Sequence, residues 1–580
     1  MRDFQLSIER DSCAPLPLRG IDSARGCSTG HSADASVTVC LLGVVGRGAE
    51  AAQLADAFVA QGRDVALFGT TPVGVVVLDH AGGDALLVAS RIGMQQIYWH
   101  VAPTRLGIAS DGRHALPPQE SVQLEPAALY RYLYFHMSPG PQTVFGGIQK
   151  LDGGHSLRWA PRGEPTLSRY WAPQFEDSTR QPEADFTRQL HDILRSSVAD
   201  ALGNRSDAGA FLSGGLDSST VAGFAAKARP GIPTVSMGFD AAGYDETEYA
   251  RIASAHFGTR ALEYYVTPDD VLSTLPSVAA AFPEPFGNSS AAATFQCARI
   301  AREHGIGLLL AGDGGDELFG GNERYARQLV FERYANAPEL LRQTLGRAVE
   351  AAGAVTTAFP VGKALSYVRQ ASVPLPDRLQ AYNFLHRHDA QEIFHADLLA
   401  AVDAEQPLSL LRREYTAAGT SNAVNRMLCM DWKFTLHDND LVKVNWATRL
   451  AGVDVAYPML TPELVEFSQQ VPGDWKVRGQ ELRWFYKRAM RGFLPAAIID
   501  KTKHGFGLPF GVWTRTHEGL RRLSEDALGS LGQRGYFKPA FLAEALRLHR
   551  DGHAAYYGEL VWILMALELW LRAHLPNARL

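Results

Sequence analysis

Two acidic, glycine-rich segments hold the residues of this chain that are best suited to chemistry. The first is SGGLDSS at residues 213–219, which follows an apolar run at 208–212 and precedes a helix-compatible stretch that begins at Thr220. A strand, a glycine turn and a helix N-terminus would direct N–H groups and hydroxyls at one point, which favours an anion such as pyrophosphate. Asp217 would repel a bare phosphate, so the pattern predicts Mg²⁺ and ATP together. A glycine turn capped by Asp or Ser is the alternative interpretation.

The second segment is LLLAGDGGDELFGG at residues 308–321, again an apolar strand that runs into an acidic glycine turn. In open α/β sheets, ligands bind at the carboxyl ends of the strands. Asp217 and Asp316 could therefore converge on one cation although they are distant in the sequence. A Walker-type GxxxxGK[ST] loop is absent from the chain.

Together the two segments resemble the ATP-pyrophosphatase domain of the asparagine synthetase family, a parallel-sheet domain of the adenine nucleotide α-hydrolase type. The resemblance implies that the first loop holds pyrophosphate and that Asp217 and Asp316 bind Mg²⁺. On this basis, the residues expected to bind ATP are Leu212, Ser213, Gly214, Gly215, Asp217, Ser218, Met237, Ala311 and Gly312.

The elements that must position these loops divide the chain into two parts. Its 580 residues, 46% hydrophobic and 20% charged, are enough for two or more domains with substantial cores. Short apolar runs between Gly, Pro and Asp turns predict β-rich structure from about residue 37 to 171, and strands alternating with helices follow. We therefore expect an α/β protein with domains at 1–172 and 185–580, joined by a polar linker at 173–184.

The N-terminal part resembles the glutamine amidotransferase domain of the same family, through Arg91-Ile92-Gly93, Gly154-His155 and Tyr170-Trp171 among other residues. The resemblance implies an Ntn-type β-sandwich. Such a domain uses an N-terminal cysteine, exposed when the initiator Met is removed, as its nucleophile. Position 2 is Arg2 here, and Cys13 would become terminal only after further processing. We expect a degenerate domain, so that ammonia from glutamine is not the amine donor.

The C-terminal part continues the family pattern through Lys503-His504-Gly505-Phe506. The resemblance implies a catalytic role for Lys503, because a fixed ammonium stabilises the charge that develops on the α-phosphate and on the carbonyl oxygen. A solvated surface lysine is the alternative. Asp313 is one methylene shorter than the family's usual Glu, and its expected role, in substrate binding or in proton transfer, stays open.

Departures from the family pattern fall where the acceptor substrate would lie. Ala456 stands where that family carries an arginine, and an arginine fork suits the α-carboxylate of free aspartate. A chain that lacks both this arginine and the glutaminase nucleophile resembles the lasso peptide cyclases. These enzymes adenylate an Asp or Glu side chain of a precursor peptide and close a macrolactam with its N-terminal amine. The alternatives are an asparagine synthetase that uses aspartate and ammonia, a β-lactam synthetase-like cyclase of small molecules, and an inactive binding scaffold.

Charge and composition exclude several other classes. A net charge of −6 without a basic block argues against nucleic acid. The N-terminus lacks the apolar core of a signal peptide, no apolar run reaches membrane-spanning length, and residues 560–571 predict a packed helix. Five cysteines without CxxC spacing predict free thiols. We expect a cytoplasmic enzyme whose partners are a precursor peptide, a leader-binding protein and a leader peptidase.

Overall fold

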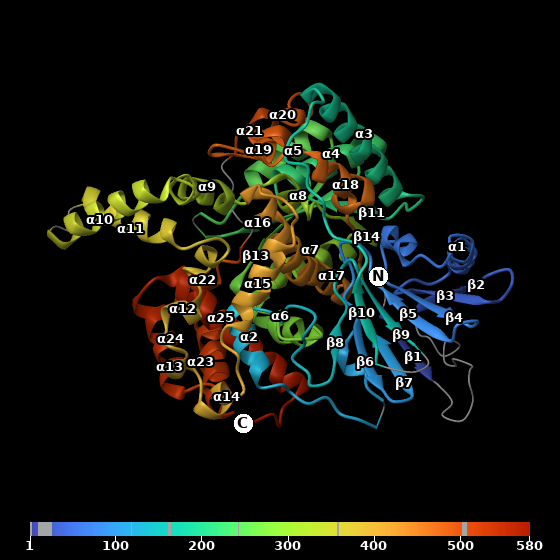
Figure 1. Ribbon diagram of the computed structural model, residues 1–580, viewed down its shortest axis with the longest axis horizontal. Coiled ribbons are helices and arrows are strands. Elements are labelled where there is room, and N and C mark those ends of the chain that lie inside the picture. The colour runs from blue at the N-terminus through green and yellow to red at the C-terminus, as the bar shows by residue number, and fades with distance from the viewer. Residues whose placement is uncertain are drawn as a thin grey trace.

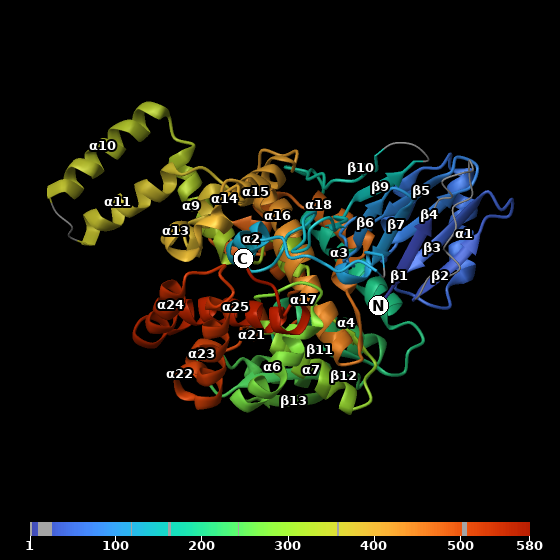
Figure 2. The ribbon, with the colours of Figure 1, turned by 90° about the horizontal axis from the view of Figure 1, so that it is seen from below.

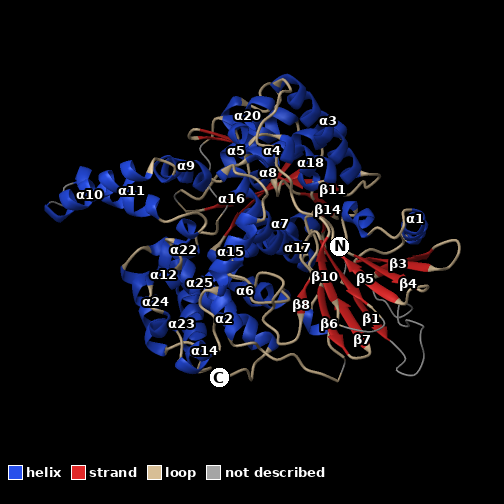
Figure 3. Ribbon diagram, in the orientation of Figure 1, coloured by secondary structure: helices blue, strands red, loops and turns tan. Residues whose placement is uncertain are grey.

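The computed structural model describes residues 3–9, 26–117, 119–160, 164–241, 243–355, 359–501 and 507–580. Figure 3 shows an antiparallel sandwich formed before residue 170 and a parallel sheet formed after residue 207. A segment without helix or strand, residues 170–182, joins the sandwich to the second region. A short antiparallel hairpin of β16 (Val477–Arg478) and β17 (Glu481–Leu482) lies apart from both. The fold class is therefore the α/β class predicted from the sequence, whereas the exact domain boundaries stay a prediction.

The N-terminal region is a sandwich because its strands alternate between two apolar environments. In β3 (Val37–Leu42), Val39 and Leu41 pack with α1 (Gly48–Ala60), and Cys40 and Leu42 pack between the two sheets. All pairings are antiparallel. One sheet has the order β1 (Gln5–Glu9), β7 (Arg105–Ala109), β6 (Tyr98–Ala102), β8 (Gln149–Lys150), and the other β10 (Thr166–Arg169), β9 (His155–Trp159), β5 (Asp84–Val88), β4 (Val75–Asp79), β3, β2 (Cys27–His31).

The second region is built on a five-stranded parallel sheet. Its two acidic loops follow neighbouring strands, since Ala210 lies opposite Leu310 in the register. The strand order runs outward in both directions from this pair, which makes the gap between their carboxyl ends a topological switch point. The order is β13 (Arg260–Val266), β12 (Pro233–Phe239), β11 (Ala208–Phe211), β14 (Leu308–Leu310), β15 (Asp454–Ala456).

Helices cover both faces of this sheet (Figures 1 and 2). On one face, α3 (Glu183–Leu202) and α4 (Leu216–Ala228) pack against β11 and β14. The other face packs against α6 (Pro268–Ala281) and α7 (Ser290–Glu303). Burial on both faces explains why the strands read as continuous apolar runs rather than as alternating ones.

The C-terminal helices α22 (Phe510–Thr516), α23 (Glu518–Gly532) and α24 (Pro539–Asp551) surround α25 (Ala554–His574). Helix α25 is long and apolar enough to cross a membrane, but 72% of its most apolar window is buried inside the protein. Its Glu568 is fully buried and accepts a hydrogen bond from Arg534 Nε at 2.6 Å. It is therefore a core helix, which confirms the prediction for residues 560–571.

A helical arm projects from the body of the second region. Helix α9 (Glu323–Ala335) leads into α10 (Glu339–Val355) and α11 (Phe359–Ser372), which extend away from the sheet side by side in Figures 1 and 2. Helix α10 is continuous to Val355, and α23 is continuous from Glu518 to Gly532.

Candidate functional site

The first acidic loop forms a compact turn at the N-terminus of α4. Gly214 has a φ of 72°, which lets the chain reverse directly after β11. The Ser213 and Ser218 hydroxyls lie 3.0 Å apart, and Ser218 Oγ also accepts from the Ser213 N–H at 3.2 Å. Helix α4 begins at Leu216, four residues before the Thr220 start that we expected, and this places Asp217 in its first turn.

The second acidic loop touches the first one. A Cβ added to Gly312 would lie 2.7 Å from the Ser218 nitrogen, and one added to Gly315 would lie 2.2 Å from Asp217 Oδ1. Only glycine therefore allows the backbone of the second loop to approach the helix N-terminus this closely. The two loops form one cradle at the switch point of the sheet.

Asp217 and Asp316 both contact the guanidinium of Arg483. Arg483 Nη1 donates to Asp217 Oδ1 at 3.1 Å, its Nη2 donates to Asp217 Oδ2 at 2.8 Å, and Nη2 also pairs with Asp316 Oδ1. Burial raises the pKa of Asp217, an effect that Arg483 opposes. The two carboxylates thus share one cation, although sequence reasoning did not single out Arg483, which belongs to no motif that we recognised.

The cradle opens into a cavity of about 870 Å³. Met237 and Cys297 lie on its wall together with Leu212 and Ser213 of the first loop. The other predicted residues on this wall are Gly215, Asp217, Ser218, Gly312, Asp313 and Asp316.

Gly214 and Ala311 do not line the cavity, although both were predicted to bind ATP. A Cβ on Gly214 would lie 2.5 Å from the backbone nitrogen of Ala250, and the Ala311 N–H donates to the Ala456 carbonyl at 2.9 Å. Both residues therefore serve the packing of the loops behind the cavity wall in this structure.

A cluster of ionisable groups lies on the cavity wall beside the second loop. Burial raises the pKa of Asp313 to about 6, and Lys443 partly opposes this shift. Burial also raises the pKa of Glu317 well above its usual range, with further contributions from Asp440 and Asp431. Lys443 Nζ donates to Asp440 Oδ1 at 2.7 Å; burial disfavours its charge, but Asp440 and Asp313 outweigh burial and raise its pKa. The pKa of Asp313 therefore lies well above that of an ordinary aspartate, as is common for functional carboxyl groups.

Lys503 lies outside the described residues, so its placement stays a prediction. The neighbouring Lys501 lines the cavity, where its Nζ lies 3.0 Å from Glu246 Oε2 and 4.4 Å from the ring centroid of Tyr249. The described part of the chain therefore brings the segment that precedes Lys503 to the cavity edge.

Ala456, which stands in place of an arginine, is the last residue of β15 and pairs with Leu310 of β14. Strand β15 therefore lies beside β14, which ends three residues before Asp313. Asn445, in the helix that precedes β15, contacts the N-terminal region, because its Nδ2 donates to the Met94 carbonyl at 2.8 Å. The described structure places only a methyl group at the strand end where the family has a guanidinium.

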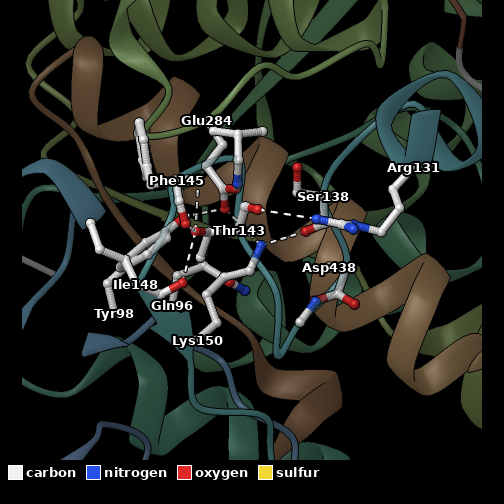
Figure 4. A network of polar contacts seen from close by, with 12 residues as sticks. Gln96, Tyr98, Arg131, Ser138, Thr143, Phe145, Ile148, Lys150, Glu284 and Asp438 are labelled. Carbon is white, nitrogen blue, oxygen red and sulfur yellow. Dashed lines mark hydrogen bonds and ion pairs between the residues drawn. The ribbon is translucent and has the colours of Figure 1, made fainter. Parts of the chain in front are cut away.

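A buried ion pair joins the N-terminal sandwich to the cavity wall (Figure 4). Lys150 Nζ lies 2.7 Å from Glu284 Oε1, and both side chains are less than one-tenth exposed. Tyr98 OH donates to the same oxygen at 2.9 Å, and the Val144 N–H donates to Oε2 at 2.7 Å. Glu284 lies shortly before Asn288, which lines the cavity. The sandwich therefore fixes part of this wall.

Comparisons with known proteins agree with this architecture. A family profile described as asparagine synthase matches residues 189–572, and one described as a glutamine amidotransferase domain matches residues 54–171.

Similar proteins carry related names. The glutamine-hydrolyzing asparagine synthetase 1 of Bacillus subtilis is 22% identical over 493 residues, which cover 84% of this chain and 75% of that protein. A putative glutamine-hydrolyzing asparagine synthetase of Mycobacterium tuberculosis is 27% identical over 459 residues, 77% of this chain and 67% of the relative. Amidase chry2 of Gibberella zeae is 20% identical over 482 residues, 76% of this chain and 69% of the relative.

Proposed function

The chain belongs to the asparagine synthase family of ATP-dependent amide-forming enzymes, and from this premise we propose that it is a peptide macrolactam synthetase. It would adenylate a side-chain carboxylate of a precursor peptide and join it to the N-terminal amine of the same peptide. The observation that supports ATP-dependent amide formation is the cradle. There, Asp217 and Asp316, from loops that follow neighbouring strands, both contact Arg483 beside the cavity.

The cradle has the donor set that ATP and Mg²⁺ require. Glycine backbone and the Ser213 and Ser218 hydroxyls would hold pyrophosphate at the N-terminus of α4. Asp217 and Asp316 would hold Mg²⁺, because hard carboxylate oxygens are its preferred ligands. When bound, this ion neutralises charge on the leaving pyrophosphate. Met237 and Gly312 would border the nucleoside, since both line the cavity.

The proposed reaction has two steps, and both would take place in the cavity. A carboxylate oxygen of the peptide attacks the α-phosphorus of ATP, the bond to pyrophosphate breaks, and an acyl-adenylate forms. The peptide amine then attacks the carbonyl carbon, a C–N bond forms, the bond to AMP breaks, and AMP leaves. Asp313 would accept the proton that the amine loses, because its pKa of about 6 keeps it ionised at neutral pH. Lys503 would balance the phosphate charge.

One departure supports a peptide over free aspartate. Ala456 offers a methyl group where an arginine would grip an α-carboxylate. An amine already carried by the substrate removes the need for ammonia, and holding both groups on one chain lowers the entropic cost of closure. We further propose a cytoplasmic location and partners of the same pathway, a leader-binding protein and a leader peptidase.

An asparagine synthetase that uses aspartate and ammonia is the second candidate, because the relatives from Bacillus subtilis and Mycobacterium tuberculosis are named as glutamine-hydrolyzing asparagine synthetases. A β-lactam synthetase-like cyclase of small molecules, which shares the same chemistry, is the third candidate. An inactive scaffold is the fourth, although Asp217, Asp313 and Asp316 are all present in the cradle.

One incubation separates these candidates. The purified protein receives ATP and Mg²⁺ with a synthetic leaderless precursor peptide, or with aspartate and ammonium, and the products are weighed by mass spectrometry. Peptide that has lost one water, with an equal amount of AMP, supports the macrolactam synthetase. Asparagine formation would favour the asparagine synthetase over the macrolactam synthetase. Absence of AMP with either substrate would favour the scaffold or a cyclase of another small molecule. Asp217→Asn protein serves as the inactive control.

A further inference from the structure

An exposed cluster of arginine and tyrosine side chains lies next to the cavity. Arg327 of α9 lines the cavity, and its guanidinium lies 5.8 Å from the ring centroid of Tyr382. The guanidinium of Arg387, in α12 (Phe384–Arg387), lies 4.9 Å from the rings of both Tyr382 and Tyr556. We call these four residues the Arg–Tyr cluster. Its tyrosines pack against one another as well, because Tyr556 OH donates to the Tyr382 carbonyl at 3.2 Å.

The cluster is built to receive a ligand rather than to close the fold. Tyr382 is 52% exposed, which is high for an aromatic side chain placed between two arginines. Within the described ranges, neither Arg327 nor Arg387 has a carboxylate at ion-pair distance. Six of the ten arginines that contact aromatic rings in the described part of the chain have such a partner, as Arg324 has in Asp431. Arg327 Nη2 donates to Tyr382 OH at 3.4 Å, and the other guanidinium donors of Arg327 and Arg387 have no carboxylate partner there, so they can pair with a group that comes from outside.

The charge of the cavity differs from that of the cluster. Among the described residues, nine acidic and five basic side chains line the cavity, so this part of its wall attracts an amine. Its acidic residues are Asp217, Glu246, Asp313, Asp316, Glu317, Glu323, Asp440, Glu481 and Asp500, and its basic residues are Arg327, Lys443, Arg483, Lys487 and Lys501. A chain with an amine at one end and carboxylates further along would therefore be drawn in with its amine first and its acidic part outside.

We infer that the Arg–Tyr cluster binds an acidic segment of the acceptor peptide, beyond the residue that reacts. The inference rests on the proposed function, because it concerns the substrate of the same cavity. Arg327 lies on both surfaces and connects the cavity to Tyr382 and Arg387. Arginine forks pair with carboxylates, and the tyrosine rings hold the forks in place while offering an apolar surface to the peptide.

Direct binding tests this inference without turnover. The probe is a fluorescein-labelled synthetic peptide with a free N-terminal amine, one aspartate for ring closure and glutamates in its tail; its counterpart has glutamines in the tail. We expect the wild-type protein to bind the glutamate-tailed peptide about tenfold more tightly by fluorescence anisotropy. Arg387→Gln and Tyr382→Ala should each remove most of this preference. Arg369→Gln, which removes an exposed charge from the arm, should keep it.

Equal affinity for the two peptides in the wild-type protein overturns the inference, and so does a preference that survives in Arg387→Gln. Binding of an acidic partner protein that depends on Arg387, with no preference between the peptides, assigns the cluster to that partner instead. AMP release is measured in parallel. If the protein prefers the glutamate-tailed peptide but releases no AMP, the inference about the Arg–Tyr cluster holds and the proposed function fails. If the peptide causes AMP release but the protein shows no preference between the tails, the proposed function holds and the inference fails.

Discussion

The carboxylate of Asp217 accepts two hydrogen bonds from the guanidinium of Arg483, at 2.8 and 3.1 Å, and Asp316 pairs with the same guanidinium. Arg483 is 7% exposed, and it lies between two half-buried carboxylates from loops that are about a hundred residues apart in the chain. Arg483 thus neutralises one of the two negative charges of the cradle before any nucleotide enters.

Replacing Arg483 tests this neutralisation. In Arg483→Gln, the two carboxylates would repel each other without a cation, and we expect a loss of roughly 3–5 kcal/mol of stability in EDTA. Mg²⁺ should restore much of the melting temperature in the variant and raise that of the wild type far less. Differential scanning fluorimetry with a Mg²⁺ titration measures both effects.

The control for that experiment is Arg488→Gln, in helix α20 (Trp484–Ala489), which begins directly after Arg483; Arg488 pairs with Glu183 near the surface. An exposed ion pair contributes at most about 1 kcal/mol, so Mg²⁺ should not affect this variant differently from the wild type. Equal stabilisation of all three proteins by Mg²⁺ would contradict a cation site at Asp217 and Asp316.

Asp313 should control the second step more than the first. Asp313→Asn removes the proton acceptor, so we expect amide formation to slow by about 10²–10⁴ while peptide-dependent exchange of pyrophosphate into ATP continues. In the wild type, the rate of ring closure should fall as the pH drops through about 6, because protonated Asp313 cannot accept a proton. Loss of both steps in Asp313→Asn would assign the residue to carboxylate or nucleotide binding instead.

Lys443 provides a matched test of the same pH profile. Its positive charge lowers the pKa of Asp313, so Lys443→Gln should raise that pKa and move the acidic limb of the profile to higher pH. Stopped assays of AMP release between pH 5 and pH 9 at saturating substrate measure the shift. An acidic limb that stays in place would show that another group titrates there.

Lys503 should act on the adenylation step. Lys503→Gln removes an ammonium that would stabilise phosphate charge, and we expect pyrophosphate exchange to fall by about 10²–10³. Lys363→Gln, which changes an exposed lysine of the arm, is the control for a lost surface charge. If both variants exchange pyrophosphate at the wild-type rate, Lys503 is a surface lysine after all.

The buried pair of Lys150 and Glu284 should hold the sandwich against the cavity wall. Lys150→Met leaves the Glu284 carboxylate buried without its cation, which should cost roughly 3–5 kcal/mol and raise the KM for ATP. The double variant Lys150→Met/Glu284→Gln should recover much of the stability, since an amide oxygen still accepts from Tyr98. Calorimetry of the wild type, both single variants and the double variant measures the coupling, and purely additive losses would contradict it.

The sequence predicted the cradle because both of its loops are local patterns. Residues 213–219 and 308–321 each show a strand, glycines and an acidic residue in order, and parallel strands bring such turns to one edge. The predicted start of α4 was four residues too late, because the turn ends at Gly215 and the polar residues that follow it are already helical. The packed nature of α25 was predictable from one charge, Glu568, in an apolar run.

The remaining parts of the site depend on tertiary structure. Arg483 and Asp440 belong to segments far from both loops, and no spacing rule connects them with Asp217 or Asp313 before the chain is folded. Gly214 depends on the fold in the same way, because a Cβ added to it would meet Ala250 and it does not line the cavity. Its expected role in ATP binding stays a prediction. Lys503 lies outside the described residues, so its role stays a prediction.

The fate of the carboxylate oxygen tests the proposed chemistry most directly. A precursor peptide whose ring-forming side chain carries oxygen-18 is incubated with the protein, ATP and Mg²⁺, and AMP is analysed by mass spectrometry. If the carboxylate attacks the α-phosphorus, one labelled oxygen appears in each AMP and the peptide closes with the loss of one water. AMP without the label, or a closed peptide without AMP, would contradict adenylation of the peptide in this cavity.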